Sequence, residues 1–182
     1  MQTNFIIPQS IIQVPDSDFP SISWKNLENV SSATFYAEST QPLYCISGLW
    51  QERFRTKTNQ LISTNFNIPL MGSSISGIEV QTHILRKARI EDLLIQLTLN
   101  GSLIGENKAD MTSSKEAYYE NKTVVGDYHI YGSETDLWNT ELTINDIQNP
   151  TFGVSIAYQS NEMIPHRDLV FLNQLALRVY FA

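Results

Sequence analysis

Hydrophobic and polar residues alternate with a period of two along most of this chain beyond its first 21 residues, and helical periodicity is almost absent. In one such segment Ile78, Val80 and Ile84 fall on the same face. Glu79 and His83 fall on the opposite face, so we expect them at the surface rather than as ligands. Many short segments of this kind, separated by turn residues, predict an all-β protein built as an antiparallel sandwich or barrel.

The predicted strands share alternating apolar side chains between turn residues. They are residues 78–84, 90–99, 102–105, 124–130, 137–144, 152–158 and 175–181. The dipeptide Asn100-Gly101 predicts a two-residue hairpin, because both residues tolerate positive φ. Residues 145–150 end in a proline and predict a short helical turn. The last predicted strand reaches the C-terminus, so we expect the chain to end inside a sheet.

Residues 106–123 form the longest polar stretch of the chain. Loops of this length are usually functional or mobile, and one helical turn fits residues 115–119. Tyr118 and Tyr119 lie in this stretch and are candidates for a recognition loop, because a tyrosine offers a flat apolar face with a polar hydroxyl. Recognition of a partner or glycan and a plain solvated loop both stay open here.

The first 21 residues differ from the rest, because short apolar pieces alternate there with Pro8, Pro15 and Pro20. Proline removes backbone donors and stops helices, so we predict an extended arm over residues 1–21 and a sandwich domain over residues 22–182. The arm must bury its apolar residues on its own domain or on a neighbouring subunit, and we favour the neighbour. The candidate assembly residues are Phe5, Ile6, Ile7, Ile11 and Ile12.

Several residues have predicted framework roles. Gly77 and Gly153 lie at or within strands, where glycine permits a bulge or the close approach of another backbone. Asp136 and Asp146 stand beside turns, where an aspartate accepts hydrogen bonds from nearby backbone N–H groups. Trp138 lies in a strand pattern, and we expect it in the core.

Composition narrows the class of partner. Of 182 residues 42% are hydrophobic and 17% charged, against about 25% charged in an average globular protein. The 12 basic and 19 acidic residues give a net charge of −7, and no basic cluster exceeds Arg86-Lys87, so we expect no nucleic-acid partner. No stretch approaches the roughly 18 apolar residues of a membrane span, and the N-terminus lacks the pattern of a secretory signal. We therefore expect synthesis in a cytoplasm and no membrane partner.

Motifs for catalysis or metal binding are absent from the sequence, so we expect no enzyme, no cofactor and no metal site. The single cysteine, Cys45, looks like a small apolar strand residue. The histidines at 83, 129 and 166 lack zinc-binding spacing. Acidic loop residues leave two weaker alternatives, a glycosidase carboxylate pair and a calcium site, although solvated acids are the favoured interpretation. The acids in question are Asp16, Asp18, Glu106, Asp110, Glu116 and Glu120.

The ordered set of motifs across residues 22–182 resembles a β-sandwich module that recurs in structural proteins of tailed bacteriophages. The motifs are Trp24 with Asn26–Val30, Phe66–Pro69, Ile75–Val80, Asn107–Asp110, Asp136–Trp138, Asp146-Ile147, Phe152–Val154 and Val179-Tyr180. The chain departs from the module at two places. It has Asn173-Gln174 where the module usually has an aspartate and an aromatic residue, and it has Gly132-Ser133 where the module usually has two glycines. The resemblance implies a jelly roll without catalytic residues, used in capsid decoration, fibres and baseplates.

We therefore expect a jelly-roll-like β-sandwich that serves in a virion as a capsid decoration or cement protein. In this interpretation the chain is a homotrimer whose arm staples a neighbouring virion subunit, and deletion of residues 1–20 leaves the sandwich folded but reduces assembly. A tail fibre or baseplate protein is the near alternative. A carbohydrate-binding module is the rival class, and a small hydrolase is the weakest one.

Overall fold

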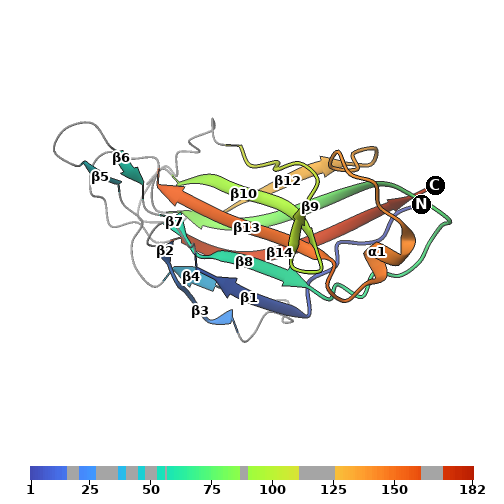
Figure 1. Ribbon diagram of the computed structural model, residues 1–182, viewed down its shortest axis with the longest axis horizontal. Coiled ribbons are helices and arrows are strands. Elements are labelled where there is room, and N and C mark those ends of the chain that lie inside the picture. Colours follow the sequence, from blue (N-terminus) through green and yellow to red (C-terminus); the bar gives the residue numbers. More distant parts are fainter. Residues whose placement is uncertain are drawn as a thin grey trace.

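The computed structural model describes residues 1–15, 21–27, 37–39, 45–47, 53–55, 57–86, 90–110, 126–160 and 170–182. These residues form two packed β-sheets, one small hairpin and one short helix (Figure 1). The prediction of an all-β, jelly-roll-like sandwich is confirmed.

One layer, the β13 sheet, has the strand order β1-β8-β13-β10-β11. Its strands are β1 (Ser10–Val14), β8 (Gln60–Thr64), β13 (Gly153–Ser160), β10 (Ile90–Leu99) and β11 (Ser102–Ile104). The two-residue strand β7 (Lys57–Thr58) also pairs with β13, and β2 (Ser21–Ile22) pairs with β7 in parallel. All other strand pairs of this sheet are antiparallel.

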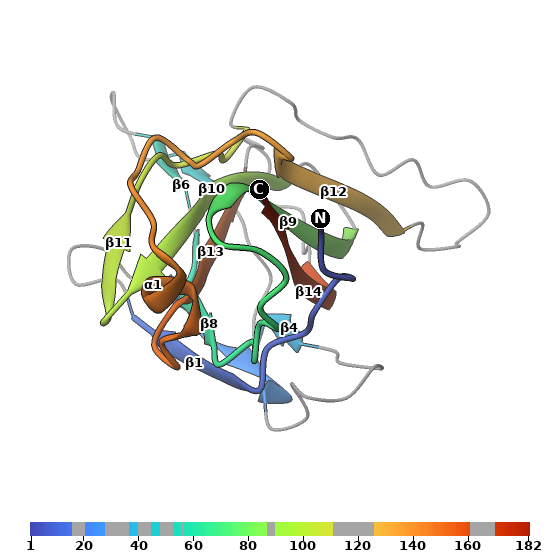
Figure 2. The same cartoon turned by 90° about the vertical axis from the view of Figure 1, so that its right-hand side faces the viewer.

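The second layer, the β9 sheet, has the order β12-β9-β14-β4-β3 and is antiparallel throughout. Its strands are β12 (Gly126–Ser133), β9 (Ile75–Arg86), β14 (Val170–Phe181), β4 (Ala37–Ser39) and β3 (Trp24–Lys25). The separate hairpin is β5 (Cys45–Ser47) with β6 (Arg53–Arg55), and the helix is α1 (Ile144–Gln148). The end-on view shows the two layers facing each other (Figure 2).

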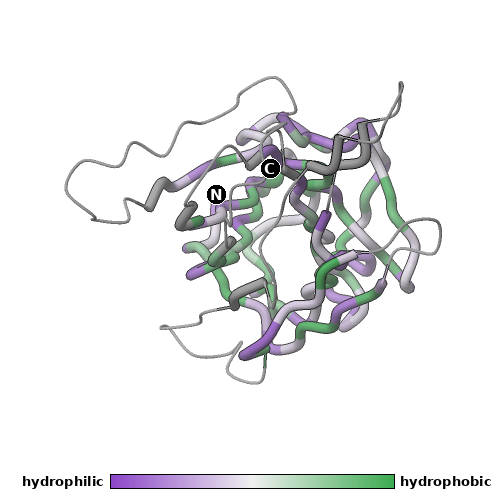
Figure 3. The backbone as a smooth tube through the Cα atoms, turned by 90° about the vertical axis from the view of Figure 1, so that its left-hand side faces the viewer, coloured by the Kyte–Doolittle hydropathy of each residue, from purple (hydrophilic) through white to green (hydrophobic). Residues whose placement is uncertain are grey.

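Strand alternation builds this core. Ile78, Val80 and Ile84 of β9 are buried, as the sequence pattern predicts, and they face buried residues such as Val154 and Ile156 of β13. Hydrophobic and hydrophilic residues alternate along the strands in the same way (Figure 3). Burial of these side chains is the main contribution to the stability of the fold.

The N-terminal segment lies on its own domain. Isolated bridges join Gln2 to Tyr180 and Ile6 to Leu177, so the first residues extend the β9 sheet beside β14. The chain then crosses to the other layer, where β1 pairs with β8 along its whole length. The predicted extended conformation is present. We expected the arm to lie on a neighbouring subunit, and this expectation is corrected for residues 1–14, which lie on their own domain. They cover strand edges of their own sandwich, which would otherwise be open to pairing.

The strand predicted over residues 137–144 is wrong. Trp138 and Asn139 have φ of 59° and 52°, which turns the chain, and the N–H of Trp138 donates to Oδ1 of Asp136 at 2.7 Å. α1 then begins at Ile144. Trp138 is nevertheless fully buried, as predicted, because the turn directs its indole into the core. Alternation suggested a strand only because a turn can also place every second residue inward.

Other local predictions are confirmed. Asn100 and Gly101 form the β10-β11 hairpin with φ of 53° and 78°. The helical turn is α1, and the C-terminal strand β14 lies inside a sheet. A Cβ at position 153 would collide with the carbonyl oxygen of Ser63, so glycine there does allow a close backbone approach.

Candidate functional site

Most outward side chains of the β13 sheet are neutral. Strand pairing aligns its outward residues in three rows across the sheet, such as Ile12, Ile62, Ser155 and Gln96 in the middle row. We call this surface the uncharged face. Its residues are Ser10, Ile12, Val14, Gln60, Ile62, Thr64, Leu94, Gln96, Thr98, Leu103, Gly153, Ser155 and Ala157, and none of them carries a charge. The next outward row of the sheet, Lys57, Gln159 and Glu91, carries two charges and ends the face.

Both margins of the uncharged face expose apolar side chains. Ile12 of β1 is 56% exposed at one margin, and Leu103 of β11 is 45% exposed at the other. A register shift between Asp92 and Leu94 interrupts the β10-β13 ladder near one end of the face. A hollow of about 280 Å³ opens there, lined by Lys57, Thr58, Gln60, Leu93, Leu94 and Ala157. Lys57 and Glu91, which both align with Gln159, thus place two charges in the row at this end of the face.

The outer surface of the β9 sheet has a different character. Arg178 lies 3.4 Å from a carboxylate oxygen of Glu79 and 3.9 Å from the ring centroid of Phe5. His83 and Tyr128 stack with ring centroids 4.3 Å apart. Charged and aromatic side chains therefore lie on the outer surface of the β9 sheet, whereas the charged outward residues Lys57 and Glu91 of the β13 sheet lie only in its end row.

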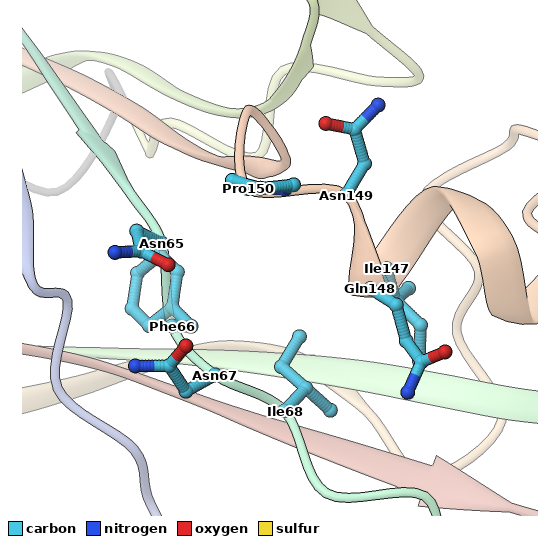
Figure 4. Close-up of a pocket in the computed structure, with 8 residues that line it drawn as sticks. All are labelled: Asn65, Phe66, Asn67, Ile68, Ile147, Gln148, Asn149 and Pro150. Carbon is cyan, nitrogen blue, oxygen red and sulfur yellow. The ribbon is translucent and has the colours of Figure 1, made fainter.

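A second candidate site is a pocket of about 220 Å³ at the end of the sandwich near α1 (Figure 4). We call it the amide pocket, because four of its lining residues carry carboxamides. Its lining residues are Asn65, Phe66, Asn67, Ile68, Ile147, Gln148, Asn149 and Pro150. None of them is charged, and the two contributing segments are joined by a hydrogen bond from the Asn65 N–H to the Pro150 carbonyl at 3.0 Å.

Local backbone conformation positions the pocket walls. Asn65 and Asn67 have φ of 57° and 50°, a region that asparagine adopts more readily than most residues. The residues that follow them, Phe66 and Ile68, are buried in the core. This alternation leaves the two asparagine side chains near the pocket and anchors the segment between β8 and β9.

The carboxamides of the pocket are not equivalent. The Asn149 side chain accepts a hydrogen bond from the Thr151 N–H at 3.0 Å and donates to Asn100, and it points away from the cavity (Figure 4). Asn65, Asn67 and Gln148 lie around the opening. A carboxamide both donates and accepts, so these three suit a neutral ligand that carries hydroxyl or amide groups.

The structure separates the predicted arm residues. Ile6 and Ile11 pack against the core, whereas Phe5 lies under the guanidinium of Arg178 and Ile7 is partly buried. Only Ile12 points outward from the sandwich to a large extent. The candidate loop residues Tyr118 and Tyr119 lie outside the described residues, as does the helical turn predicted there.

The acidic loop gives one ion-paired cluster. Lys108 Nζ lies 2.8 Å from Glu106 and 3.0 Å from Asp136, and its hydrogen bond to Glu106 is the main reason why the pKa of Lys108 is raised. Within the described part of the chain, no group of three or more His, Cys, Asp or Glu is placed to hold a metal ion. Asp16, Asp18, Glu116, Glu120 and His166 lie outside that part.

Sequence reasoning missed both the uncharged face and the amide pocket. The outward positions of β13 are Gly153, Ser155 and Ala157, and their neutrality is visible in the sequence. Their alignment with neutral positions on other strands depends on register, which the sequence does not give. The pocket depends on the approach of residues 65–68 to residues 147–150, which local patterns do not reveal. Among the described residues, no helix has the length and hydrophobicity needed to span a membrane.

No family model matches the sequence, and no curated protein matches it either. Among solved structures, the chain is similar to the CBM22-1 xylan-binding domain of Xyn10C from Paenibacillus barcinonensis, with 8% sequence identity and a TM-score of 0.32. The alignment covers 81% of this chain and 86% of that domain. A similarity this distant supports no statement on ligand or role.

Proposed function

We propose that this chain is a non-catalytic structural component of a bacteriophage particle, with capsid decoration as its specific role. A tail fibre or baseplate position is the near alternative. The phage assignment is supported by the resemblance of the ordered motifs, from Trp24 to Tyr180, to the phage sandwich module. The β-sandwich that the structure shows agrees with that resemblance.

The observation that carries an assembly role is the uncharged face. A sandwich that functions alone in water usually places charged side chains on the outer surfaces of its sheets. Here the neutral residues of five strands are brought side by side, and Ile12 and Leu103 stay exposed at the margins. The cores of protein interfaces are depleted of charge in the same way. The face therefore suits contact with other subunits of a particle.

This role also changes the function proposed for the N-terminal segment. Residues 1–14 cover the edges of their own sheets. We therefore do not propose that these residues staple a neighbouring subunit. The segment contributes to assembly through Ile12 and Val14, whose side chains lie on the uncharged face.

Mass spectrometry of purified phage particles, followed by antibody labelling in the electron microscope, tests the proposal. We expect peptides of this chain in the particles and label on the head. Label on the tail would support the fibre or baseplate alternative instead. Absence of the chain from purified particles would contradict the structural role.

A carbohydrate-binding module is the second candidate, and the amide pocket favours it. Hydroxyl groups of a sugar can both donate to and accept from Asn65, Asn67 and Gln148, and the lack of charge fits a neutral glycan. A volume of about 220 Å³ suits one sugar unit rather than a larger ligand. This site would replace the loop of Tyr118 and Tyr119 as the place of recognition.

A glycan array with wild type and two pocket variants tests this candidate. Asn67→Gly keeps the positive φ and removes the amide, and Gln148→Ala removes a second one. We expect each to weaken glycan binding by about tenfold, the effect of one lost hydrogen bond to a bound ligand. Asn145→Ala is the control, because Asn145 is an exposed amide on α1 that does not line the pocket. Absence of glycan binding by wild type, or equal binding by the pocket variants, would contradict the candidate.

A further inference from the structure

We infer that the outer surface of the β9 sheet binds a neutral glycan, with one sugar ring stacked on Tyr128. The inference goes beyond the structural role proposed above, because it assigns a ligand to a surface that this role does not use. It also differs from the glycan candidate at the amide pocket, because it depends on other residues on another part of the sandwich.

Tyr128 of β12 presents an aromatic ring to solvent. Its side chain is 59% exposed, and it lies opposite His83 in the pairing of β12 with β9. The two rings are nearly parallel, with 8° between their planes and 4.3 Å between their centroids. This stack covers one face of the tyrosine ring and holds the ring in place, so a ligand need not order a mobile side chain. The other face is a flat apolar surface next to a polar hydroxyl, which suits a sugar ring.

The strand register places carboxamides beside this ring. Gln174 of β14 lies in the same row as His83 and Tyr128, and Gln81 of β9 lies in the next row. Within the described part of the chain, no hydrogen bond engages either carboxamide. A carboxamide both donates and accepts, as a sugar hydroxyl does. We call Tyr128, His83, Gln81 and Gln174 the tyrosine site.

The row beyond Gln81 and Ile130 favours a glycan over a protein as the occupant. It contains Arg178 and Glu79, whose side chains are 3.4 Å apart and 25% and 15% exposed. An apolar protein surface would take this ion pair out of water without supplying hydrogen bonds, which is costly. Sugar hydroxyls donate to a carboxylate and accept from a guanidinium, so a glycan replaces the hydrogen bonds of the displaced water.

Net charge further restricts the ligand. The chain carries a net charge of −7, and Glu79 and Arg178 balance each other within the surface. This charge opposes the phosphates of nucleic acids and the carboxylates of acidic glycans. The ligand class that fits the stacking ring, the carboxamides and the charge is therefore a neutral glycan.

An array of neutral and sialylated oligosaccharides, probed with wild type and three variants, tests the inference. Tyr128→Ala removes the stacking ring, whereas Tyr128→Phe keeps the ring and removes only its hydroxyl. Ile12→Ala is the matched control, because Ile12 is 56% exposed and also lies on an edge strand, β1 of the other sheet. Circular dichroism verifies the fold of each variant. If Tyr128→Ala does not fold, Gln81→Ala replaces it.

We expect wild type, Tyr128→Phe and Ile12→Ala to bind the same neutral oligosaccharides with dissociation constants within about threefold, and Tyr128→Ala or Gln81→Ala to bind at least about tenfold more weakly. In NMR spectra of the most strongly bound neutral oligosaccharide, wild type should shift the sugar C–H signals upfield through the ring current of Tyr128. Tyr128→Ala should remove this shift. Absence of binding to neutral oligosaccharides, binding of sialylated ones only, or equal binding by wild type and Tyr128→Ala would overturn the inference.

The proposals fail in different ways. Glycan binding that is lost in Tyr128→Ala and kept in Gln148→Ala supports the tyrosine site and overturns the amide pocket. The reverse result overturns the tyrosine site and leaves the pocket. A chain that binds no glycan but is present in phage particles overturns this inference and leaves the structural role intact.

Discussion

The indole nitrogen of Trp138 donates a hydrogen bond to the carbonyl oxygen of Ile78 at 2.9 Å. This bond ties the connection between β12 and α1 to the central strand β9, and both residues are fully buried. Gly132 makes the arrangement possible, because a Cβ there would collide with the same carbonyl oxygen and lie 2.8 Å from the indole nitrogen. Packing therefore requires a glycine at position 132.

Gly132→Ala should lower the free energy of unfolding substantially. The substitution adds left-handed strain of about 1–2 kcal/mol and a steric clash that typically costs about 1–3 kcal/mol. Gly101→Ala is a matched control, because Gly101 also has positive φ, at 78°, but has open space where its Cβ would lie. Urea denaturation should show a larger loss for Gly132→Ala than for Gly101→Ala. Equal losses would mean that the close approach to Ile78 contributes nothing.

The stability of the short helix α1 should depend on pH, because Asp146 in its first turn is a titratable group with a lowered pKa. The carboxylate of Asp146 accepts hydrogen bonds from the hydroxyl of Thr143 at 2.6 Å and from its N–H at 2.8 Å, and these lower the pKa of Asp146 from its ordinary value of 3.8. Since the pKa is lower in the folded state, the stabilisation is present above the ordinary value and is lost as the pH falls through the folded value.

NMR titration of the Asp146 carboxyl carbon should therefore give a pKa below 3.8. Thr143→Ala should raise that pKa toward its ordinary value and reduce stability at neutral pH by about 1 kcal/mol, the usual effect of removing a helix cap. A Thr143→Ala variant whose Asp146 titrates as in wild type would contradict the capping interaction.

Deletion of residues 1–14 should produce an aggregating protein of reduced stability. The segment hydrogen-bonds to β14 through Ile6 and Leu177 and supplies β1 beside β8, so its removal opens an edge in each sheet. This outcome differs from the folded, assembly-deficient protein that the sequence alone leads one to expect. Light scattering and thermal unfolding measure it, with Ile12→Lys as a control that keeps the backbone pairing. A soluble deletion variant that unfolds at the wild-type temperature would contradict the structural role of the segment.

The sequence predicted the parts of the fold that depend on local pattern. Alternation gave the burial of Ile78 and Val80 correctly, because a strand exposes every second residue to the core. Asn100-Gly101 gave the hairpin, because few other dipeptides accept two positive φ values. The turn at Trp138 was missed, since its φ is rare for tryptophan and no local residue signals it.

Features that depend on distant pairing could not be predicted in this way. Contact between Ile6 and Leu177 joins residues at opposite ends of the chain, and the apolar pattern of the arm fits its own domain as well as a neighbour. The uncharged face arises because the register places Ile12, Ile62, Ser155 and Gln96 in one row. The sequence of one strand shows which of its own residues point outward, but not which residues of other strands lie beside them.

Quantitative mass spectrometry of particles produced with wild type, Ile12→Lys or Ile130→Lys tests most directly whether the chain joins a particle through its uncharged face. We predict equal copy numbers per particle for wild type and Ile130→Lys, and depletion of Ile12→Lys by at least about tenfold, because a buried unpaired charge opposes assembly. Absence of the wild-type chain from the particles, or incorporation of Ile12→Lys at the wild-type level, would contradict the account.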